Sequence, residues 1–263
     1  MSNKIDIFLA CAPKDFIKLP YVIDSIVRNV LERGKIIICS PIPIKESVLS
    51  QIKNTAFYTF DDNTTLDCCN RSKWIYRPNW CFQQHLKLFQ QVTSDWYLTL
   101  DCDTIINRPM TFFEGDKPVC YKGFNQFHAP YFAFMGYMID LGRISGTSFI
   151  ADMNLFYRPI ITEMLERSQF TIKSFIEKSQ KITNKYCHIG EPELYGNYCM
   201  KYHGDMYVER FLKQRPFAGR TQEAVLGSVW NKEEIESMIS TIASEDYDTF
   251  SFHSWLNEGD QNG

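Results

Sequence analysis

The sequence lacks the long apolar stretch that a membrane-spanning helix requires, because none of its runs approaches about 18 consecutive apolar residues. Glycine and proline are scarce, at 13 and 11 of the 263 residues, which excludes collagen-like and low-complexity chains. An excess of basic residues is also missing: 28 Lys and Arg against 31 Asp and Glu give no electrostatic basis for binding nucleic acid or an acidic membrane. What is present is a hydrophobic content of 44%, which predicts a globular protein with its own core.

Paired cysteines at metal-binding spacing are absent as well. The nine cysteines are an odd number, and no two of them form the C-x-x-C pair that is typical of a structural zinc site. We therefore expect reduced and mostly buried thiols. The first residues, MSNKIDIFLACAPKDF, become charged too soon for a signal peptide. Together these features predict a cytoplasmic protein, in the host cytoplasm if the source is a virus, without a transmembrane segment.

Strand-length apolar runs alternate with amphipathic helical patterns in the first part of the chain. The pattern predicts strands at Lys4–Ala10, Lys35–Ser40, Ala56–Phe60 and Trp96–Leu100, and helices at Tyr21–Glu32, Ile44–Lys53 and Trp80–Val92. Strands that alternate with helices favour a parallel sheet covered on both faces. The predicted fold class is therefore α/β and Rossmann-like, with a mostly parallel central sheet flanked by helices.

The second part of the chain, from about residue 111, is less regular. Its patterns predict strands at Val119–Tyr121, Phe132–Ile139 and Met153–Tyr157, and helices at Pro159–Arg167, Phe170–Ser179 and Glu191–Lys201. No linker rich in Gly, Ser or Pro separates this part from the first 110 residues. We therefore predict a single domain over residues 1–263, in which an irregular second half completes a cleft.

Two aspartates follow directly on the apolar strand predicted at Trp96–Leu100. Asp101 and Asp103 are two residues apart, so their side chains project the same way if the chain stays extended. They lie at the carboxyl end of a strand, where open α/β sheets bind their ligands. Two carboxylates at one point repel each other unless a cation lies between them, and Mn²⁺ or Mg²⁺ suits such oxygens. Short motifs of this kind also arise by chance, and we expect the second copy, Asp246-Tyr247-Asp248, to be a solvated acidic loop.

Several stretches, taken in chain order, resemble a known family. They are the ACAPKDF segment, Trp80-Cys-Phe-Gln-Gln-His-Leu-Lys-Leu88, Tyr97-Leu-Thr-Leu-Asp-Cys-Asp103 and Gly190-Glu-Pro-Glu-Leu-Tyr-Gly-Asn-Tyr198. A β-α-β half that ends in Asp-x-Asp resembles the GT-A class of nucleotide-sugar glycosyltransferases, and the ordered set is similar to the DUF6492-type glycosyltransferases. The resemblance implies a GT-A-like fold, with a nucleotide-binding half up to about residue 110 and an acceptor-side half after it.

The resemblance also implies an activity and its partners. It implies a hexosyltransferase-type enzyme that moves a sugar from a nucleotide-diphosphate sugar to a glycan or another hydroxyl acceptor. A UDP-sugar is expected from the class, while GDP and dTDP remain open. Asp103 would bind Mn²⁺ or Mg²⁺ directly, and Asp101 would contact the ribose or reach the metal through water. His253, in an aromatic segment near the chain end, would complete the metal shell.

Further residues are expected to contact the donor. Ala12, Pro13 and Asp15 follow the first predicted strand, where Asp15 can accept a hydrogen bond from the base and the other two can form an apolar wall. An ordinary turn explains the same residues equally well. Gln84 and Lys87 are three apart, hence on one face of the predicted helix, and are expected to contact the donor.

An inverting transfer needs a base that takes the proton of the acceptor hydroxyl. Glu191 and Glu193 stand at a predicted helix start, where the helix dipole favours their ionised form. Acidic residues also cap helices routinely. We expect Glu191 to be the base and Glu193 to hold an acceptor hydroxyl, and leave open which glutamate points into the cleft. Asp152, before a predicted strand, is expected to bond the donor sugar, and His128 is a further candidate for a sugar contact.

Two other functions remain as alternatives. A metal-dependent sugar-phosphate nucleotidyltransferase also combines a parallel sheet with a carboxylate-bound cation. It normally carries a glycine-rich basic loop after the first strand, however, and ACAPKD contains no glycine. A non-catalytic carbohydrate-binding protein of the same fold would have no need of Asp101, Asp103 and both glutamates.

Overall fold

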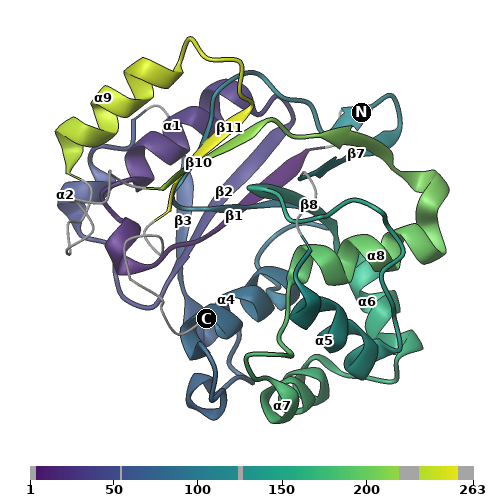
Figure 1. Cartoon of the computed structure of the whole chain (residues 1–263). Coiled ribbons are helices and arrows are strands. Elements are labelled where there is room, and N and C mark those ends of the chain that lie inside the picture. Colours follow the sequence, from purple (N-terminus) through teal and green to yellow (C-terminus); the bar gives the residue numbers. More distant parts are fainter. Residues whose placement is uncertain (1–3, 54, 124–126, 219–230, 254–263) are drawn as a thin grey trace.

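The computed structural model of the chain describes residues 4–53, 55–123, 127–218 and 231–253 (Figure 1). A five-stranded sheet with the order β3-β2-β1-β4-β8 lies at its centre. The strands are β1 (Ile5–Ala10), β2 (Arg33–Ser40), β3 (Phe57–Asp61), β4 (Trp96–Asp101) and β8 (Met153–Tyr157). The first four are parallel, and β8 runs antiparallel to β4. The predicted α/β class with a mostly parallel sheet is confirmed.

Helices cover both faces of this sheet. On one face α1 (Leu19–Asn29) packs against Ile7 and Leu9 of β1, and on the other α4 (Pro78–Phe89) packs near Phe8 and Ala10. Because both faces are covered, every residue of β1 is buried, and apart from Asp6 the strand is apolar on both of its faces. Two short helices, α2 (Glu46–Leu49) and α3 (Asp62–Thr65), flank β3.

The remaining strands of the described residues form two smaller sheets. One has the order β10-β11-β5 and consists of β10 (Gln214–Ala218), β11 (Thr249–His253) and β5 (Thr104–Ile106). The other has the order β6-β7-β9 and consists of β6 (Phe113–Glu114), β7 (Lys117–Lys122) and β9 (Val208–Phe211). Since β11 pairs with β5, the last described strand lies directly beside the segment that follows Asp103. The helix before it, α9 (Lys232–Ile242), buries Ile235 and Ile242 in the core shared with α1.

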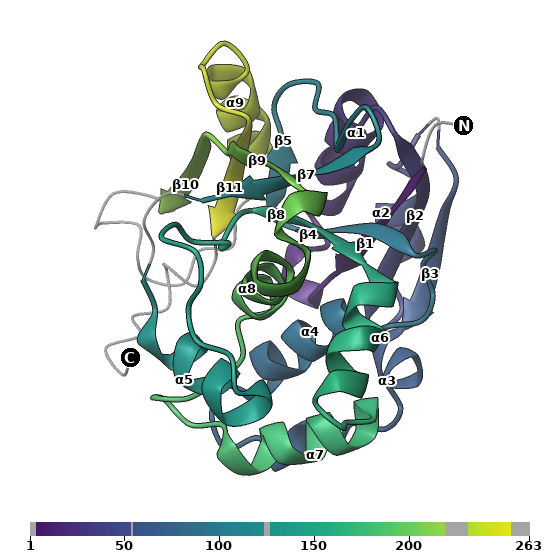
Figure 2. The ribbon, with the colours of Figure 1, turned by 90° about the vertical axis from the view of Figure 1, so that its right-hand side faces the viewer.

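The second half of the chain supplies a group of helices. They are α5 (Ala129–Ile139), α6 (Arg158–Arg167), α7 (Ile172–Ile182) and α8 (Glu191–His203). Figure 2 shows α8 in the middle of this group, where it contacts α4, α5 and α6. Three short 3₁₀ helices connect other elements: η1 (Pro13–Asp15), η2 (Arg71–Lys73) and η3 (Gly204–Met206). Across the described ranges, every helix is too short or too polar to cross a membrane.

The strand predicted at Phe132–Ile139 is wrong, because these residues form most of α5. A continuous apolar run of this length is compatible with either a buried strand or a buried helix, and periodicity does not separate the two. The deciding features are Pro130, which suits the first turn of a helix, and the contacts of α5 with α7 and α8. The helices predicted around α6, α7 and α8 are confirmed within a few residues at their ends.

Candidate active site

Asp101 ends β4 at the carboxyl edge of the sheet, opposite Ala10 of β1. Helix α4 directs two side chains to it. Lys87 Nζ lies 2.7 Å from Asp101 Oδ1, and Gln83 Nε2 lies 3.5 Å from the same oxygen and donates to the Ala10 carbonyl at 3.3 Å. Gln83 and Lys87 are four residues apart and therefore share one face of the helix. The end of β4 is thus held by a cation and an amide from α4.

Lys87 also reaches the start of α8. Its Nζ lies 3.3 Å from Glu191 Oε1, and the side chains of Lys87 and Glu191 are only 8% and 2% exposed. Burial alone would lower the pKa of the Lys87 ammonium, but the carboxylates of Asp101 and Glu191 raise it above its usual value. A cation therefore joins one carboxylate at the end of β4 to another at the start of α8.

Glu191 is a buried carboxylate that is only partly satisfied. Burial raises its pKa, Lys87 opposes that shift, and the negative charge of Asp101 adds to it. Its second oxygen, Oε2, is buried and has no hydrogen-bond partner among the described residues. Such an oxygen is costly in a folded protein, and a buried group with a shifted pKa is a candidate for function.

Asp103 lies on the α1 side of the same edge and is 8% exposed. Its carbonyl oxygen accepts a hydrogen bond of 2.8 Å from the Phe252 amide of β11. The nearby Asp15 accepts a bond of 2.7 Å from Lys18, whose Nζ also donates to the Phe252 carbonyl at 2.9 Å. Burial chiefly raises the pKa of Asp15, Lys18 lowers it, and the charge of Asp103 raises it further. Asp15, Lys18 and Asp103 are therefore neighbours in one buried charged group.

The other residues predicted to contact the sugar donor lie around η1, on α4 and directly before β8. Ala12 and Pro13 begin η1 directly after β1, with Ala12 half-buried and Pro13 exposed. Gln84 is buried on α4, while its neighbour Gln83 makes the contact with Asp101. Asp152 precedes β8 and accepts a hydrogen bond of 2.8 Å from Thr249 of β11. Their contacts with a donor remain predictions.

His253 is the last residue of β11, and the pairing of Phe252 with Asp103 brings this end of the strand to the aspartate pair. The side chain of His253 lies outside the described residues, so its role in metal binding remains a prediction. Lys18 and Gln83 were missed by the sequence analysis. Their spacing could have identified them, because Lys18 follows Asp15 by three residues and Gln83 precedes Lys87 by four.

Glu193 is placed differently from Glu191. It is fully buried, and both of its carboxylate oxygens accept hydrogen bonds from the protein. Ser148 Oγ and the Phe149 amide donate to Oε1 at 2.7 and 3.1 Å, and Asn197 Nδ2 donates to Oε2 at 2.9 Å. These bonds hold the loop before β8 to α8. The predicted contact of Glu193 with an acceptor hydroxyl remains a prediction, beside this clear structural role.

We expect Glu193→Gln to lower the free energy of unfolding by about 1.5–3 kcal/mol, because hydrogen bonds to a buried carboxylate are lost or weakened. Urea denaturation followed by circular dichroism measures the change. Glu166→Gln, at an exposed position on α6, is the matched control and should change stability by less than about 0.5 kcal/mol. Equal stability of the Glu193 variant and the unmodified protein would contradict the structural role.

The aspartate pair has the chemistry that a hard divalent cation needs. Asp101 and Asp103 offer carboxylate oxygens, the ligands that Mg²⁺ and Mn²⁺ prefer. In the parts of the chain that the structure describes, no group of three or more His, Cys, Asp or Glu side chains could hold a metal ion, so metal binding by the aspartates remains a prediction.

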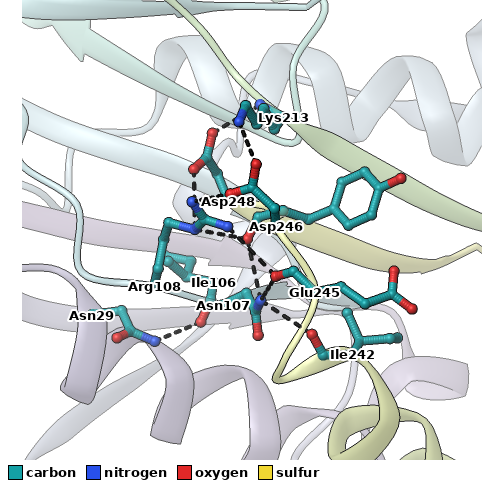
Figure 3. Close-up of polar contacts among 10 residues, drawn as sticks. Asn29, Ile106, Asn107, Arg108, Lys213, Ile242, Glu245, Asp246 and Asp248 are labelled. Atoms are coloured by element: carbon teal, nitrogen blue, oxygen red, sulfur yellow. Dashed lines mark hydrogen bonds and ion pairs between the residues drawn. The ribbon is translucent and has the colours of Figure 1, made fainter.

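The second Asp-x-Asp motif differs in its partners. Figure 3 shows Asp246 and Asp248 beside Arg108 and Lys213. Arg108 lies 2.8 Å from Asp246 and 3.4 Å from Asp248, and Lys213 Nζ lies 2.5 Å from Asp246. Lys213 and Arg108 lower the pKa of Asp246. The motif borders a surface hollow of about 650 Å³, and its ion pairs with these two cations join the loop before β11 to Arg108 and Lys213.

Comparisons with known proteins bear on the fold. No protein-family model matches the sequence, and a search of curated proteins finds no significant match. Among solved structures, the apo form of mouse xyloside xylosyltransferase 1 is similar over 96% of this chain and 99% of its own, with a TM-score of 0.50 and 10% identity. The fold is that of a GT-A glycosyltransferase.

Two further structures with this GT-A fold are similar to the chain. The galactosyltransferase LgtC, in complex with donor and acceptor sugar analogs, matches over 94% of this chain and 87% of its own, with a TM-score of 0.46 and 11% identity. The bifunctional glycosyltransferase WbbM in its apo form matches over 96% of this chain but 46% of its own, with a TM-score of 0.48 and 11% identity. The GT-A-like fold is confirmed by the likeness to the xylosyltransferase, while the resemblance to DUF6492-type enzymes remains a prediction.

Proposed function

We propose that this chain transfers a sugar from a nucleotide-diphosphate sugar to a hydroxyl acceptor, with Mn²⁺ or Mg²⁺ as cofactor. The observation that carries the proposal is the position of Asp101 at the end of β4 and of Asp103 two residues later, at the carboxyl edge of a GT-A sheet where such sheets bind their ligands. These two aspartates would hold the cation, with His253 as a further ligand. When bound, the cation supplies positive charge to the departing diphosphate.

The donor would lie along this edge of the sheet. Ala12, Pro13 and Asp15 follow the end of β1, whose last residue pairs with Asp101 in the sheet. They would flank the base of the nucleotide. UDP is the expected nucleotide, with GDP and dTDP as the other candidates. Gln83 and Lys87 project from α4 to Asp101 and would keep its carboxylate oriented toward the donor. Asp152, directly before β8, would form a hydrogen bond with the donor sugar.

For the chemical step we propose inversion, with Glu191 as the base. The Lys87 ammonium stabilises the ionised form of Glu191, although burial favours the neutral form. An ionised Oε2 without another partner can take the acceptor's hydroxyl proton. The acceptor oxygen then bonds to the anomeric carbon, while the bond from that carbon to the diphosphate oxygen breaks and its electron pair leaves with the nucleoside diphosphate.

Glu191→Gln should lower kcat/KM for transfer by about 10²–10⁴-fold, because the amide cannot accept the proton. The Kd for UDP, measured by calorimetry, should stay nearly unchanged. Glu166→Gln on the exposed face of α6 serves as the control. Full activity of the Glu191 variant would exclude this residue as the base. A product with the donor's own anomeric configuration, as seen by NMR, would exclude inversion.

The function itself is tested with a panel of nucleotide sugars, with Mn²⁺ and after chelation. Release of a nucleoside diphosphate that depends on the metal is the expected result. Pyrophosphate release from a nucleoside triphosphate and a sugar phosphate would instead indicate a nucleotidyltransferase. Binding of the panel without any turnover would indicate a carbohydrate-binding protein.

A further inference from the structure

A second group of side chains lies next to Glu191 and has no part in the step described above. It consists of Arg77, Trp80, His128, Tyr131 and His188, and we call it the rim cluster. The His188 ring meets the rings of Trp80 and Tyr131 edge-on, with centroids 5.4 and 5.3 Å apart. The His128 ring lies 4.4 Å from that of Tyr131. Arg77 and His128 are exposed, Trp80 and Tyr131 are half-buried, and His188 is buried beneath them.

The rim cluster is continuous with the candidate active site. A Cβ atom at Gly190 would lie 2.6 Å from the Tyr131 ring, so this ring packs directly on the backbone that precedes Glu191. Burial raises the pKa of Tyr131, and the charge of Glu191 raises it further. A molecule held by the rim cluster would therefore lie beside the proposed base, on the acceptor side.

The two histidines of the cluster form a neutral pair. Their Nε2 atoms are 3.0 Å apart, and His188 Nδ1 lies 3.1 Å from the Asn184 carbonyl oxygen. Because a carbonyl only accepts, Nδ1 of His188 carries the proton, and in the neutral ring Nε2 accepts from Nε2–H of His128. Burial and the charge of Arg77 lower the pKa of both rings, that of His188 to about 4.

Arg77 is a cation without a counter-charge in the described structure. Its guanidinium lies 4.9 Å above the Trp80 ring, and no described residue forms an ion pair or hydrogen bond with it. Other arginines pair with carboxylates, namely Arg28, Arg71, Arg108, Arg167, Arg210 and Arg215. Among the described residues, no carboxylate contacts His128 or His188 either. The site therefore offers a positive, planar group that matches a carboxylate or phosphate.

We infer that the rim cluster binds an acidic group on the acceptor, a carboxylate or a phosphate carried by a sugar. Arg77 holds the acidic oxygens, Nδ1 of His128 accepts a hydrogen bond from a neighbouring hydroxyl of the sugar, and the rings of Trp80 and Tyr131 contact the apolar face of the sugar. This inference rests on the proposed function, since it names the class of acceptor. It explains why an exposed arginine is stacked on a ring near Glu191 and has no counter-charge among the residues that the structure describes.

Proton NMR of the histidine Hε1 signals tests the inference without any turnover. The chain has 5 histidines, so the spectrum is simple, and His128→Gln assigns the signal of interest. The probes are glucuronate, glucose 6-phosphate, glucose and UDP, each added to the full-length protein. Saturable movement of the His128 signal with glucuronate, with glucose 6-phosphate or with both is expected, and the responding probe identifies the acid. Glucose should have little effect.

Arg77→Ala should raise the Kd of the responding acid by about tenfold or more, because a charged hydrogen bond is lost. Arg77→Lys should give an intermediate Kd. Arg167→Ala is the matched control, since Arg167 is also exposed and lies 4.2 Å above a ring, that of Tyr202. The dispersion of the remaining histidine signals reports whether each variant is folded.

Three results would overturn the inference: equal movement with glucose, an unchanged Kd in Arg77→Ala, or the same saturable movement with UDP, which would assign the site to the donor. The outcome is separable from the proposed function. Binding of an acidic sugar in a protein without transferase activity would refute the transfer reaction but retain the acid site. Transfer to neutral acceptors without acid binding would refute only the acid site.

Discussion

Asp103→Asn should reduce sugar transfer by about 10³-fold or more. The asparagine keeps the size of the side chain but removes the negative charge that would hold a divalent cation against the diphosphate. Loss of one group that stabilises charge in the transition state costs about 10²–10³ in kcat, and loss of the cation adds to this. Initial rates of nucleoside diphosphate release, measured over a range of Mn²⁺ concentrations, give the effect on kcat and on the metal requirement.

The second Asp-x-Asp motif provides the control for this experiment. Asp246→Asn alters the same residue type in the same motif, at a side chain that is 72% exposed and paired with Arg108 and Lys213. Its activity should be close to that of the unmodified protein. Equal activity of the Asp103 and Asp246 variants, or full activity after chelation, would remove the proposed metal-dependent transfer.

Lys87→Met should lower the free energy of unfolding by about 3–5 kcal/mol, because it leaves the buried carboxylate of Glu191 without a compensating charge. Chemical denaturation at neutral pH measures the loss. Lys213→Met removes a lysine of similar length from an exposed pair and should cost at most about 1 kcal/mol. The double variant Lys87→Met with Glu191→Gln should recover much of the lost stability, since no uncompensated charge remains.

The Lys87 variant should also depend on pH in a defined direction. Burial raises the folded-state pKa of Glu191 above its unfolded value of 4.5, and without Lys87 the rise is larger. The stability that this group contributes is complete below the unfolded pKa and is lost as pH rises through the folded pKa. The deficit of the variant should therefore be smaller near pH 5 than at pH 8. A deficit that is constant with pH would show that Glu191 is not the group left uncompensated.

Much of the first half of the chain could be predicted from the sequence. The strands β1, β2 and β4 are short, mostly apolar runs between helical patterns, and this pattern is a direct consequence of burial on both sheet faces, whereas the edge strand β3 is mostly exposed. The place of Asp101 at the end of β4 follows from the same pattern. The second half was harder to predict, because the apolar run of α5 fits a strand as well as a helix.

The candidate site was predicted only in part. The sequence analysis paired Gln84 with Lys87, whereas the rotation of α4 brings Gln83 to Asp101. The sequence predicted Glu191 as the base and Glu193 as the partner of an acceptor hydroxyl, and left open which of the two points into the cleft. Packing joins Glu191 to Lys87 and surrounds Glu193 with donors from its own helix and the loop before β8. Sequence spacing determines which residues share a helix face, but the residues that this face contacts depend on tertiary packing.

The sequence by itself determined the α/β order of the chain and an aspartate pair at the end of a central strand, since both depend on neighbours along the chain. Only the tertiary structure decided that Lys87 joins Asp101 to Glu191, and that Arg77 over Trp80 and His128 beside Tyr131 belong to one cluster. These contacts join residues far apart in sequence, and they depend on how α4, α5 and α8 pack against one another. The local hydrophobic pattern of the sequence indicates which residues are buried, whereas the packing of the helices determines which residue lies beside a buried charge.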